Sequence, residues 1–102
     1  MFIAEARNRA LAQAKGEYLY LIDSDDWVLP DMLEVMYGRA KRFDAQYVVA
    51  GYYMDYFVNG NNESYAVCPD DRDYQQQEFR ENAIRYLVHT ILTVPWNKLY
   101  SI

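Results

Sequence analysis

Cysteine and histidine are almost absent from this chain of 102 residues, which has one of each, Cys68 and His89. A single cysteine cannot form an internal disulfide, so a disulfide-stapled fold is excluded and a reducing, intracellular setting fits. Cys68 has no second Cys or His at the spacing of a zinc site, and His89 has no carboxylate at ligand spacing. We interpret both as residues without a chemical role.

Long apolar runs and an excess of positive charge are absent as well. No run approaches the roughly 20 apolar residues of a transmembrane helix. The first 17 residues are interrupted by Glu5, Arg7 and Arg9, so they are not a signal peptide. The net charge is −5 with no basic stripe, which argues against a nucleic-acid partner. These absences predict a cytoplasmic protein without a transmembrane segment, with the inner face of the membrane as the alternative location.

The composition that remains is typical of one small folded domain, with 52% hydrophobic and 25% charged residues. Hydrophobic spacing and β-forming residues predict alternating helices and strands, which favours an α/β architecture. Because strand 17–22 is apolar on both faces, we expect it to lie inside a parallel sheet. The predicted elements are helices 2–15, 30–43 and 75–92, strands 17–22 and 46–57, and a short return strand at 65–67 after the turn signal Asn59-Gly60-Asn61-Asn62.

An acidic tetrad, Asp23-Ser24-Asp25-Asp26, directly follows the apolar strand 17–22. Three carboxylates so close together repel one another unless a cation or solvent compensates them. Oxygen-ligated divalent metals supply such compensation, and open α/β sheets bind ligands just beyond their strand ends. The tetrad therefore predicts a site for a metal and phosphate.

Arg7 is the basic residue that the helical pattern singles out. It shares one face of helix 2–15 with Ile3, Ala10, Leu11 and Ala14, so a cation lies within an apolar stripe. In one interpretation its stem packs while its head reaches water or pairs with a carboxylate. In the other, the guanidinium reaches an anion near the acidic tetrad.

Five segments of the chain form a recognisable combination. They are Ala6-Arg7-Asn8, Ala14-Lys15-Gly16-Glu17-Tyr18, Leu21-Ile22-Asp23-Ser24-Asp25-Asp26-Trp27, Pro30-Asp31-Met32-Leu33 and Trp96-Asn97-Lys98-Leu99-Tyr100. The combination resembles the middle of the inverting family-2 glycosyltransferases, which have the GT-A fold. The last segment is similar to one that recurs in bacterial members.

The resemblance implies transfer of a sugar from a nucleotide diphosphate-sugar to an acceptor, in cell-surface polysaccharide biosynthesis. It implies a partial GT-A (Rossmann-like) domain, with a mixed sheet flanked by about three helices. Asp23 and Asp25 match the family's DxD element, which binds Mn²⁺ or Mg²⁺ and the donor diphosphate, and Asp26 is a further metal candidate. Arg7 matches a position near the donor.

Two family features have no counterpart in residues 1–102. These are the N-terminal strand that holds the nucleotide base and the acidic base that deprotonates the acceptor. We therefore expect a single incomplete domain, inactive on its own, with no catalytic base. Its exposed sheet edges would favour a homodimer.

Three alternatives to this assignment remain. A haloacid-dehalogenase-like phosphatase also places Asp-x-Asp after a strand, but Trp27 stands where a small residue should follow. An EF-hand calcium loop would put Trp27 and Val28 at positions that need an oxygen ligand and a glycine. The third alternative is a non-catalytic truncated domain that self-associates. Among lesser candidates, we interpret Trp27 and Trp96 as core residues and Asp55 as having no role.

Overall fold

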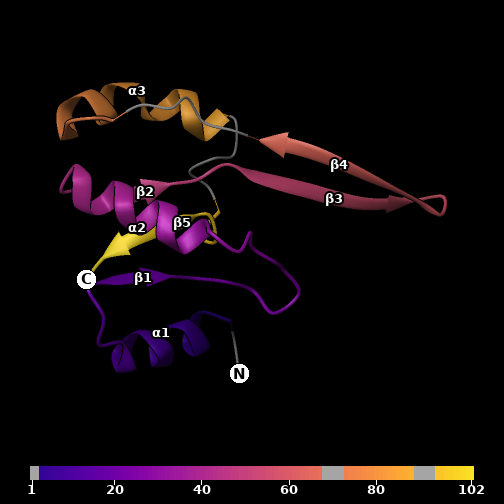
Figure 1. The fold of residues 1–102 in the computed structure, drawn as a ribbon, viewed down its shortest axis with the longest axis horizontal. Coiled ribbons are helices and arrows are strands. Elements are labelled where there is room, and N and C mark those ends of the chain that lie inside the picture. The colour runs from indigo at the N-terminus through magenta and orange to yellow at the C-terminus, as the bar shows by residue number, and fades with distance from the viewer. Residues whose placement is uncertain (1–2, 68–72, 89–93) are drawn as a thin grey trace.

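The computed structural model describes residues 3–67, 73–88 and 94–102, so Cys68 and His89 lie outside the described residues. Within these ranges the chain forms three helices and two small antiparallel sheets, which confirms the α/β class (Figure 1). The molecule measures 45 × 33 × 26 Å along its principal axes. The elements are α1 (Ile3–Gln13), β1 (Tyr18–Tyr20), α2 (Met32–Arg42), β2 (Tyr47–Val49), β3 (Tyr52–Val58), β4 (Asn61–Val67), α3 (Gln76–Val88) and β5 (Lys98–Ser101).

The larger sheet has the order β1-β5-β2, with the last strand in the centre. β5 is antiparallel to both neighbours, pairing Leu99 with Tyr20 on one side and with Val48 on the other. The expectation that strand 17–22 lies inside a parallel sheet is therefore wrong. Among the described strands β1 is an edge strand, and its residues are half-buried because only β5 pairs with it.

The predicted strand 46–57 is two strands that belong to different sheets. The break falls at Ala50 and Gly51, where the backbone is held by the C-terminal segment. The Ala50 N–H donates to the Asn97 carbonyl at 2.8 Å, and Asn97 Nδ2 donates to the Ala50 carbonyl at 2.9 Å. These bonds occupy the backbone groups of Ala50, and the chain leaves the sheet at the next residue.

β3 and β4 form a separate hairpin that projects from the rest of the molecule (Figure 1). Val58 pairs with Asn61, so the loop has two residues, Asn59 and Gly60, with φ of 51° and 79°. Positive φ at both positions is typical of a type I′ turn, whose twist suits a hairpin. The predicted turn is confirmed, and the return strand begins at Asn61, four residues earlier than predicted.

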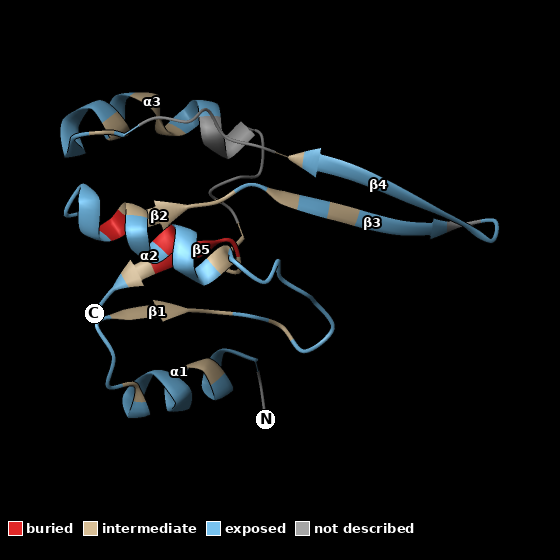
Figure 2. Cartoon of the chain, viewed as in Figure 1, coloured by how far each residue is buried: buried red, intermediate tan, exposed pale blue. Residues whose placement is uncertain are grey.

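The core lies between α2 and the larger sheet (Figure 2). Met36 and Ala40 lie one turn apart on α2 and pack with Leu99 of β5. Leu33 and Phe43, at the two ends of this helix, are exposed. The half-buried residues around this core are Tyr18, Tyr20, Met32, Val48 and Ala50.

Two polar side chains at the start of β5 are the most buried large ones among the described residues: Asn97 is 2% exposed and Lys98 is 1% exposed. Lys98 Nζ donates to the Val94 carbonyl and to Asn97 Oδ1. Burial lowers the pKa of the Lys98 ammonium. A buried ammonium is stable only when such acceptors replace its water. This C-terminal segment thus leads into the central strand of the larger sheet.

Candidate functional site

The acidic tetrad forms a tight turn shortly after β1. The Asp26 N–H donates to the Asp23 carbonyl at 3.1 Å, which closes residues 23–26 into a four-residue turn. Asp23 is partly exposed, whereas Asp25 and Asp26 are exposed. This segment, hereafter the acidic turn, lies beyond a strand end, as the sequence predicted.

Arg7 lies beside the acidic turn although 16 residues separate it from Asp23. Its Nη2 donates to Asp23 Oδ1 at 3.1 Å, so α1 is joined to the turn by an ion pair. The ion pair agrees with the first interpretation, in which the guanidinium pairs with a carboxylate, and the structure identifies that carboxylate as Asp23. Burial raises the pKa of the Tyr100 hydroxyl, and the nearby positive charge of Arg7 opposes that rise.

The carboxylates of the turn are close enough to affect one another. The pKa of Asp26 is raised, first by partial desolvation and then by the negative charges of Asp25 and Asp23. Burial, and then the charge of Asp26, raises the pKa of Tyr20, whose hydroxyl donates to the Trp96 carbonyl. The acidic turn therefore lies against β1 and the segment that leads into β5.

The carboxylate oxygens of the acidic turn suit a metal ion whose coordination shell the protein would fill only in part. Within the described ranges, no three His, Cys, Asp or Glu side chains converge into a ready metal cage. Carboxylate oxygens are nevertheless the ligands that Mg²⁺ and Mn²⁺ prefer. Mg²⁺ usually takes one or two carboxylates and completes its shell with phosphate oxygens and water. The exposed Asp25 and Asp26 suit that kind of shared coordination.

Trp27 and Asp55, both discounted from the sequence, form a contact next to the acidic turn. Trp27 is 63% exposed, so its interpretation as a core residue is wrong. Its Nε1 donates to Asp55 Oδ2 at 3.3 Å, and Ser64 Oγ donates to Asp55 Oδ1 at 2.7 Å. The alternation of side chains along a strand places Asp55 on the exposed face of β3, and this pattern could have suggested Asp55 as a site residue.

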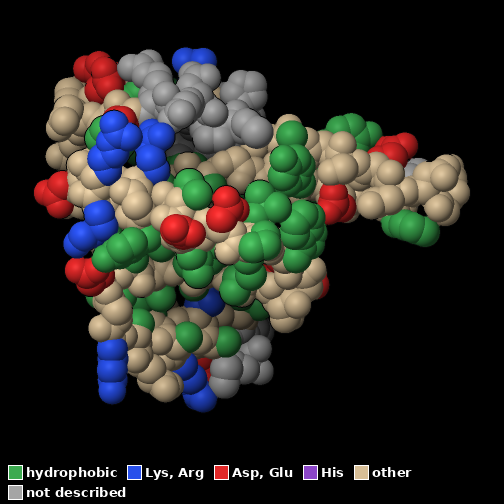
Figure 3. Space-filling model, viewed as in Figure 1, with side chains coloured by type: hydrophobic (Ala, Val, Ile, Leu, Met, Phe, Trp, Pro, Cys, Tyr) green, Lys and Arg blue, Asp and Glu red, His purple; other side chains and the backbone are tan. Residues whose placement is uncertain are grey.

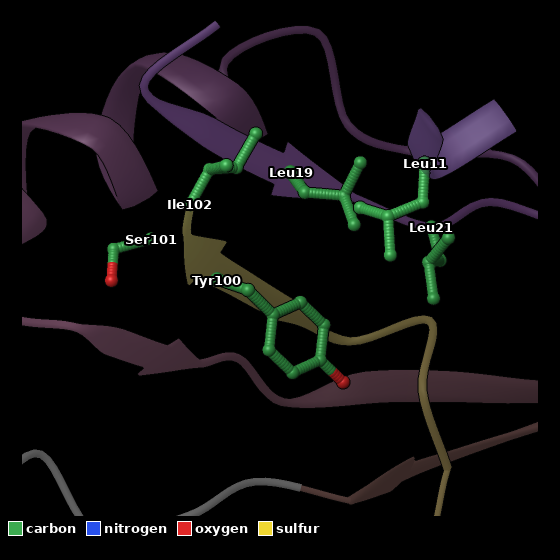
Figure 4. Close-up of a pocket in the computed structure, with 6 residues that line it drawn as sticks. All are labelled: Leu11, Leu19, Leu21, Tyr100, Ser101 and Ile102. Atoms are coloured by element: carbon green, nitrogen blue, oxygen red, sulfur yellow. The ribbon is translucent and has the colours of Figure 1, made fainter. Parts of the chain in front are cut away.

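A separate hollow of about 320 Å³ lies between α1 and the larger sheet (Figure 4). Its walls are mostly carbon, and the Tyr100 hydroxyl is the one side-chain group in it that could titrate. A substrate site usually adds several converging polar groups to an apolar pocket. We therefore place the candidate site at the acidic turn and not in this hollow. Its lining residues are Leu11, Leu19, Leu21, Tyr100, Ser101 and Ile102.

Comparison with known proteins decides the family. The family model described as glycosyl transferase family 2 matches residues 2–97. The chain belongs to glycosyl transferase family 2. This confirms the resemblance seen in the sequence, and it decides between the two enzyme classes left open, in favour of the transferase and against the phosphatase.

Relatives within family 2 come from several bacteria. Glycosyltransferase GlyG of Streptococcus pneumoniae is 37% identical over 67 residues, which cover 66% of this chain and 22% of that protein. Putative glycosyltransferase EpsH of Bacillus subtilis is 30% identical over 99 residues, covering 96% and 27%. Cholesterol galactosyltransferase of Borreliella burgdorferi is 36% identical over 69 residues, covering 68% and 19%. No solved structure matches the chain.

The chain thus spans about a quarter or less of the length of these relatives. Among the helices that the structure describes, none is long and apolar enough to cross a membrane.

Proposed function

We propose that this chain supplies the donor-binding part of a metal-assisted transfer of sugar from a nucleotide diphosphate-sugar to an acceptor hydroxyl. The observation that supports it is the acidic turn. It holds three adjacent carboxyl groups just beyond β1, one of them held by Arg7. Sugar transfer is the family's activity. At the acidic turn, a departing diphosphate would lie close to both a metal ion and the Arg7 guanidinium.

Each side chain of the site has a distinct proposed role. Asp23 and Asp25 would hold the metal and, through it, the diphosphate, and Asp26 would be a third metal ligand. Arg7 orients Asp23 through the 3.1 Å ion pair and adds positive charge on the side where the diphosphate would lie. A bound Mn²⁺ or Mg²⁺ would stabilise the charge that develops on the leaving diphosphate.

The raised pKa of Asp26 is consistent with this role. Partial desolvation, and then the negative charges of Asp25 and Asp23, raise this pKa because they disfavour the charged form of Asp26. A divalent cation bound at the turn would offset the repulsion among the three carboxylates.

We place the base that deprotonates the acceptor outside residues 1–102. Asp55 is the acid that accepts a hydrogen bond from Trp27. We do not assign it as the base, because Trp27 donates to one of its carboxylate oxygens and Ser64 donates to the other. The chain alone is therefore proposed to bind donor without completing transfer. We further propose that the site works in the cytoplasm, where nucleotide sugars are available.

Calorimetry with the 102-residue chain tests the site directly. Mn²⁺ and uridine, guanosine or thymidine diphosphate are titrated together and separately into the wild type, Asp25→Asn and Asp31→Asn. We expect at least one nucleotide to bind only when Mn²⁺ is present. Binding should weaken about tenfold or more in Asp25→Asn, since a neutral amide replaces a charged ligand. Asp31 is the matched control, because it is exposed just before α2 and its side chain makes no cap hydrogen bond. Equal binding in all three proteins would contradict the proposal.

We also propose that the chain self-associates through the exposed edges of its larger sheet. Among the described strands β1 and β2 each pair only with β5, so their outer edges present unpaired backbone groups. Sedimentation velocity across a concentration series should show a dimer that grows with concentration. A monomer at every concentration would contradict this second proposal.

A further inference from the structure

The exposed indole next to the acidic turn is held in place by polar partners. Trp27 directly follows Asp26, the last residue of the turn, and its ring is largely open to solvent. Its one polar atom, Nε1, donates to Asp55 Oδ2 at 3.3 Å. An indole with its N–H bound at one edge keeps both faces for other contacts.

Asp55 is itself fixed by the hairpin that carries it. Ser64 Oγ donates to Asp55 Oδ1 at 2.7 Å, and the two residues are opposite each other in the β3–β4 register. One carboxylate oxygen thus holds Ser64 and the other holds Trp27. The hairpin, which otherwise projects from the body, is joined to the loop after the acidic turn through this contact.

The surroundings of Trp27 are those of a ligand surface. Val28 and Leu29 continue the exposed segment, so three apolar residues in a row face solvent on this loop. Figure 3 shows hydrophobic side chains gathered near the base of the projecting hairpin, with acidic side chains close to them. An exposed apolar patch rimmed by polar groups marks a binding site more often than chance exposure does.

We propose that Trp27, oriented by Asp55, is a platform on which a pyranose ring of the substrate stacks, beside the acidic turn. The C–H groups on one face of a pyranose carry partial positive charge, and the face of an indole carries negative charge. The hydroxyls at the rim of such a ring would lie within reach of polar groups like Asp55 and Ser64. This proposal rests on the proposed function, because it assigns the sugar to the surface next to the diphosphate site.

The ring could belong to the donor sugar or to an acceptor saccharide, and two titrations of the 102-residue chain distinguish these sources. The first compares uridine diphosphate with UDP-glucose, UDP-galactose and UDP-N-acetylglucosamine, all with Mg²⁺, because paramagnetic Mn²⁺ would broaden the nearby Trp27 signal. The second uses the methyl glycosides of the same sugars without nucleotide. Nitrogen-15 NMR follows the indole N–H signals of Trp27 and Trp96, the chain's two tryptophans. Trp96 is an internal reference, since it is half-buried against Tyr52 with ring centroids 4.6 Å apart.

A stacked sugar should shift the Trp27 signal in a saturable manner and leave the Trp96 signal in place. Trp27→Ala should weaken sugar binding about tenfold. Trp27→Phe keeps a ring but loses the N–H, and it should weaken sugar binding less than Trp27→Ala does. The same is expected of Asp55→Asn. Phe57→Ala is the matched control, because Phe57 is an exposed aromatic on the same hairpin and should change nothing.

The possible outcomes separate this proposal from the proposed function. A Trp27 shift only with UDP-sugars assigns the platform to the donor, and a shift with methyl glycosides assigns it to the acceptor. If uridine diphosphate binds but no sugar shifts Trp27, the platform is wrong and the donor site stands. If methyl glycosides shift Trp27 and no nucleotide binds, the platform stands without the donor site. No Trp27 shift with any probe overturns the platform.

Discussion

The body of the molecule buries polar residues, whereas its projecting hairpin exposes aromatic ones. In the body, made of α2 and the sheet β1-β5-β2, Asn97, Lys98 and Leu99 are almost fully enclosed. In the hairpin β3–β4, Tyr53, Tyr56, Phe57 and Tyr65 are all exposed, with Phe57 at 80%. Residue type therefore does not by itself determine burial in a strand; the elements packed against the strand do.

The two regions also differ in the range of the interactions that form them. The hairpin closes through a two-residue turn, so its pairing is local in the chain. The central strand instead pairs Tyr18 with Ser101 and Tyr47 with Tyr100, contacts that close most of the chain into a loop. Closing such long loops costs entropy, which burial in the body has to offset. We therefore expect the body to determine global stability and the hairpin to open independently.

The largest contrast should come from truncating one large apolar side chain in each region. Leu99→Ala removes most of a buried side chain from the core and should lower the free energy of unfolding by about 2–5 kcal/mol. Phe57→Ala removes an exposed ring and should change it by about 0.5 kcal/mol or less. Urea unfolding followed by circular dichroism measures both. Equal losses would show that the hairpin contributes to the same cooperative core.

Asparagine truncation should give a smaller contrast of the same kind. Asn97→Ala leaves the Ala50 carbonyl and the Lys98 ammonium each without one partner. An unsatisfied buried group costs about 1–3 kcal/mol. Asn62→Ala, in the exposed part of β4, should be nearly neutral. Thermal unfolding of the two variants beside the wild type makes the comparison, and a neutral Asn97→Ala would mean that water replaces the lost amide.

High pH should weaken the body through Tyr47. Burial, and then the neighbouring Tyr100, raises the pKa of Tyr47 to about 12. The unfolded chain loses this proton near pH 10, whereas the folded chain keeps it, so stability is present below pH 10 and falls between pH 10 and 12. A shift of two pKa units corresponds to roughly 2.7 kcal/mol, and the loss should be smaller than this because the ring is only half-buried and solvent screens it. Tyr47→Phe should flatten this part of the stability profile, and an unchanged slope would assign the effect to other groups.

Two glycine substitutions should have the smallest effects, of opposite sign. Gly60 has φ of +79° in the hairpin turn, so Gly60→Ala should destabilise the hairpin by about 1 kcal/mol, because a Cβ disfavours that backbone region. Gly38 lies within α2 with nothing within 4 Å of an added Cβ, so Gly38→Ala should stabilise by roughly 0.5–1 kcal/mol. Amide exchange resolves the two regions. Gly60→Ala should speed exchange in β3 and β4 alone, and faster exchange in β5 would contradict independent opening.

Several features of the fold could be predicted because they depend on neighbours in the chain. Hydrophobic spacing predicted a helix at 30–43, where α2 lies, and Asn59-Gly60 predicted the hairpin turn. The acidic tetrad was predicted to follow a strand, and it does. Its role in binding a metal and a diphosphate stays a prediction.

By itself, the sequence determined the family, the α/β class and the chemistry available at the acidic turn, because these depend on residue types at short spacings. Only the tertiary structure decided which strand is central, where the segment 46–57 divides, and which carboxylates meet Arg7 and Trp27. Those outcomes depend on contacts between residues 16 to more than 80 positions apart. No local pattern encodes such contacts, since they form only when segments distant in the chain pack together, as β1 and β5 do around the buried Leu99.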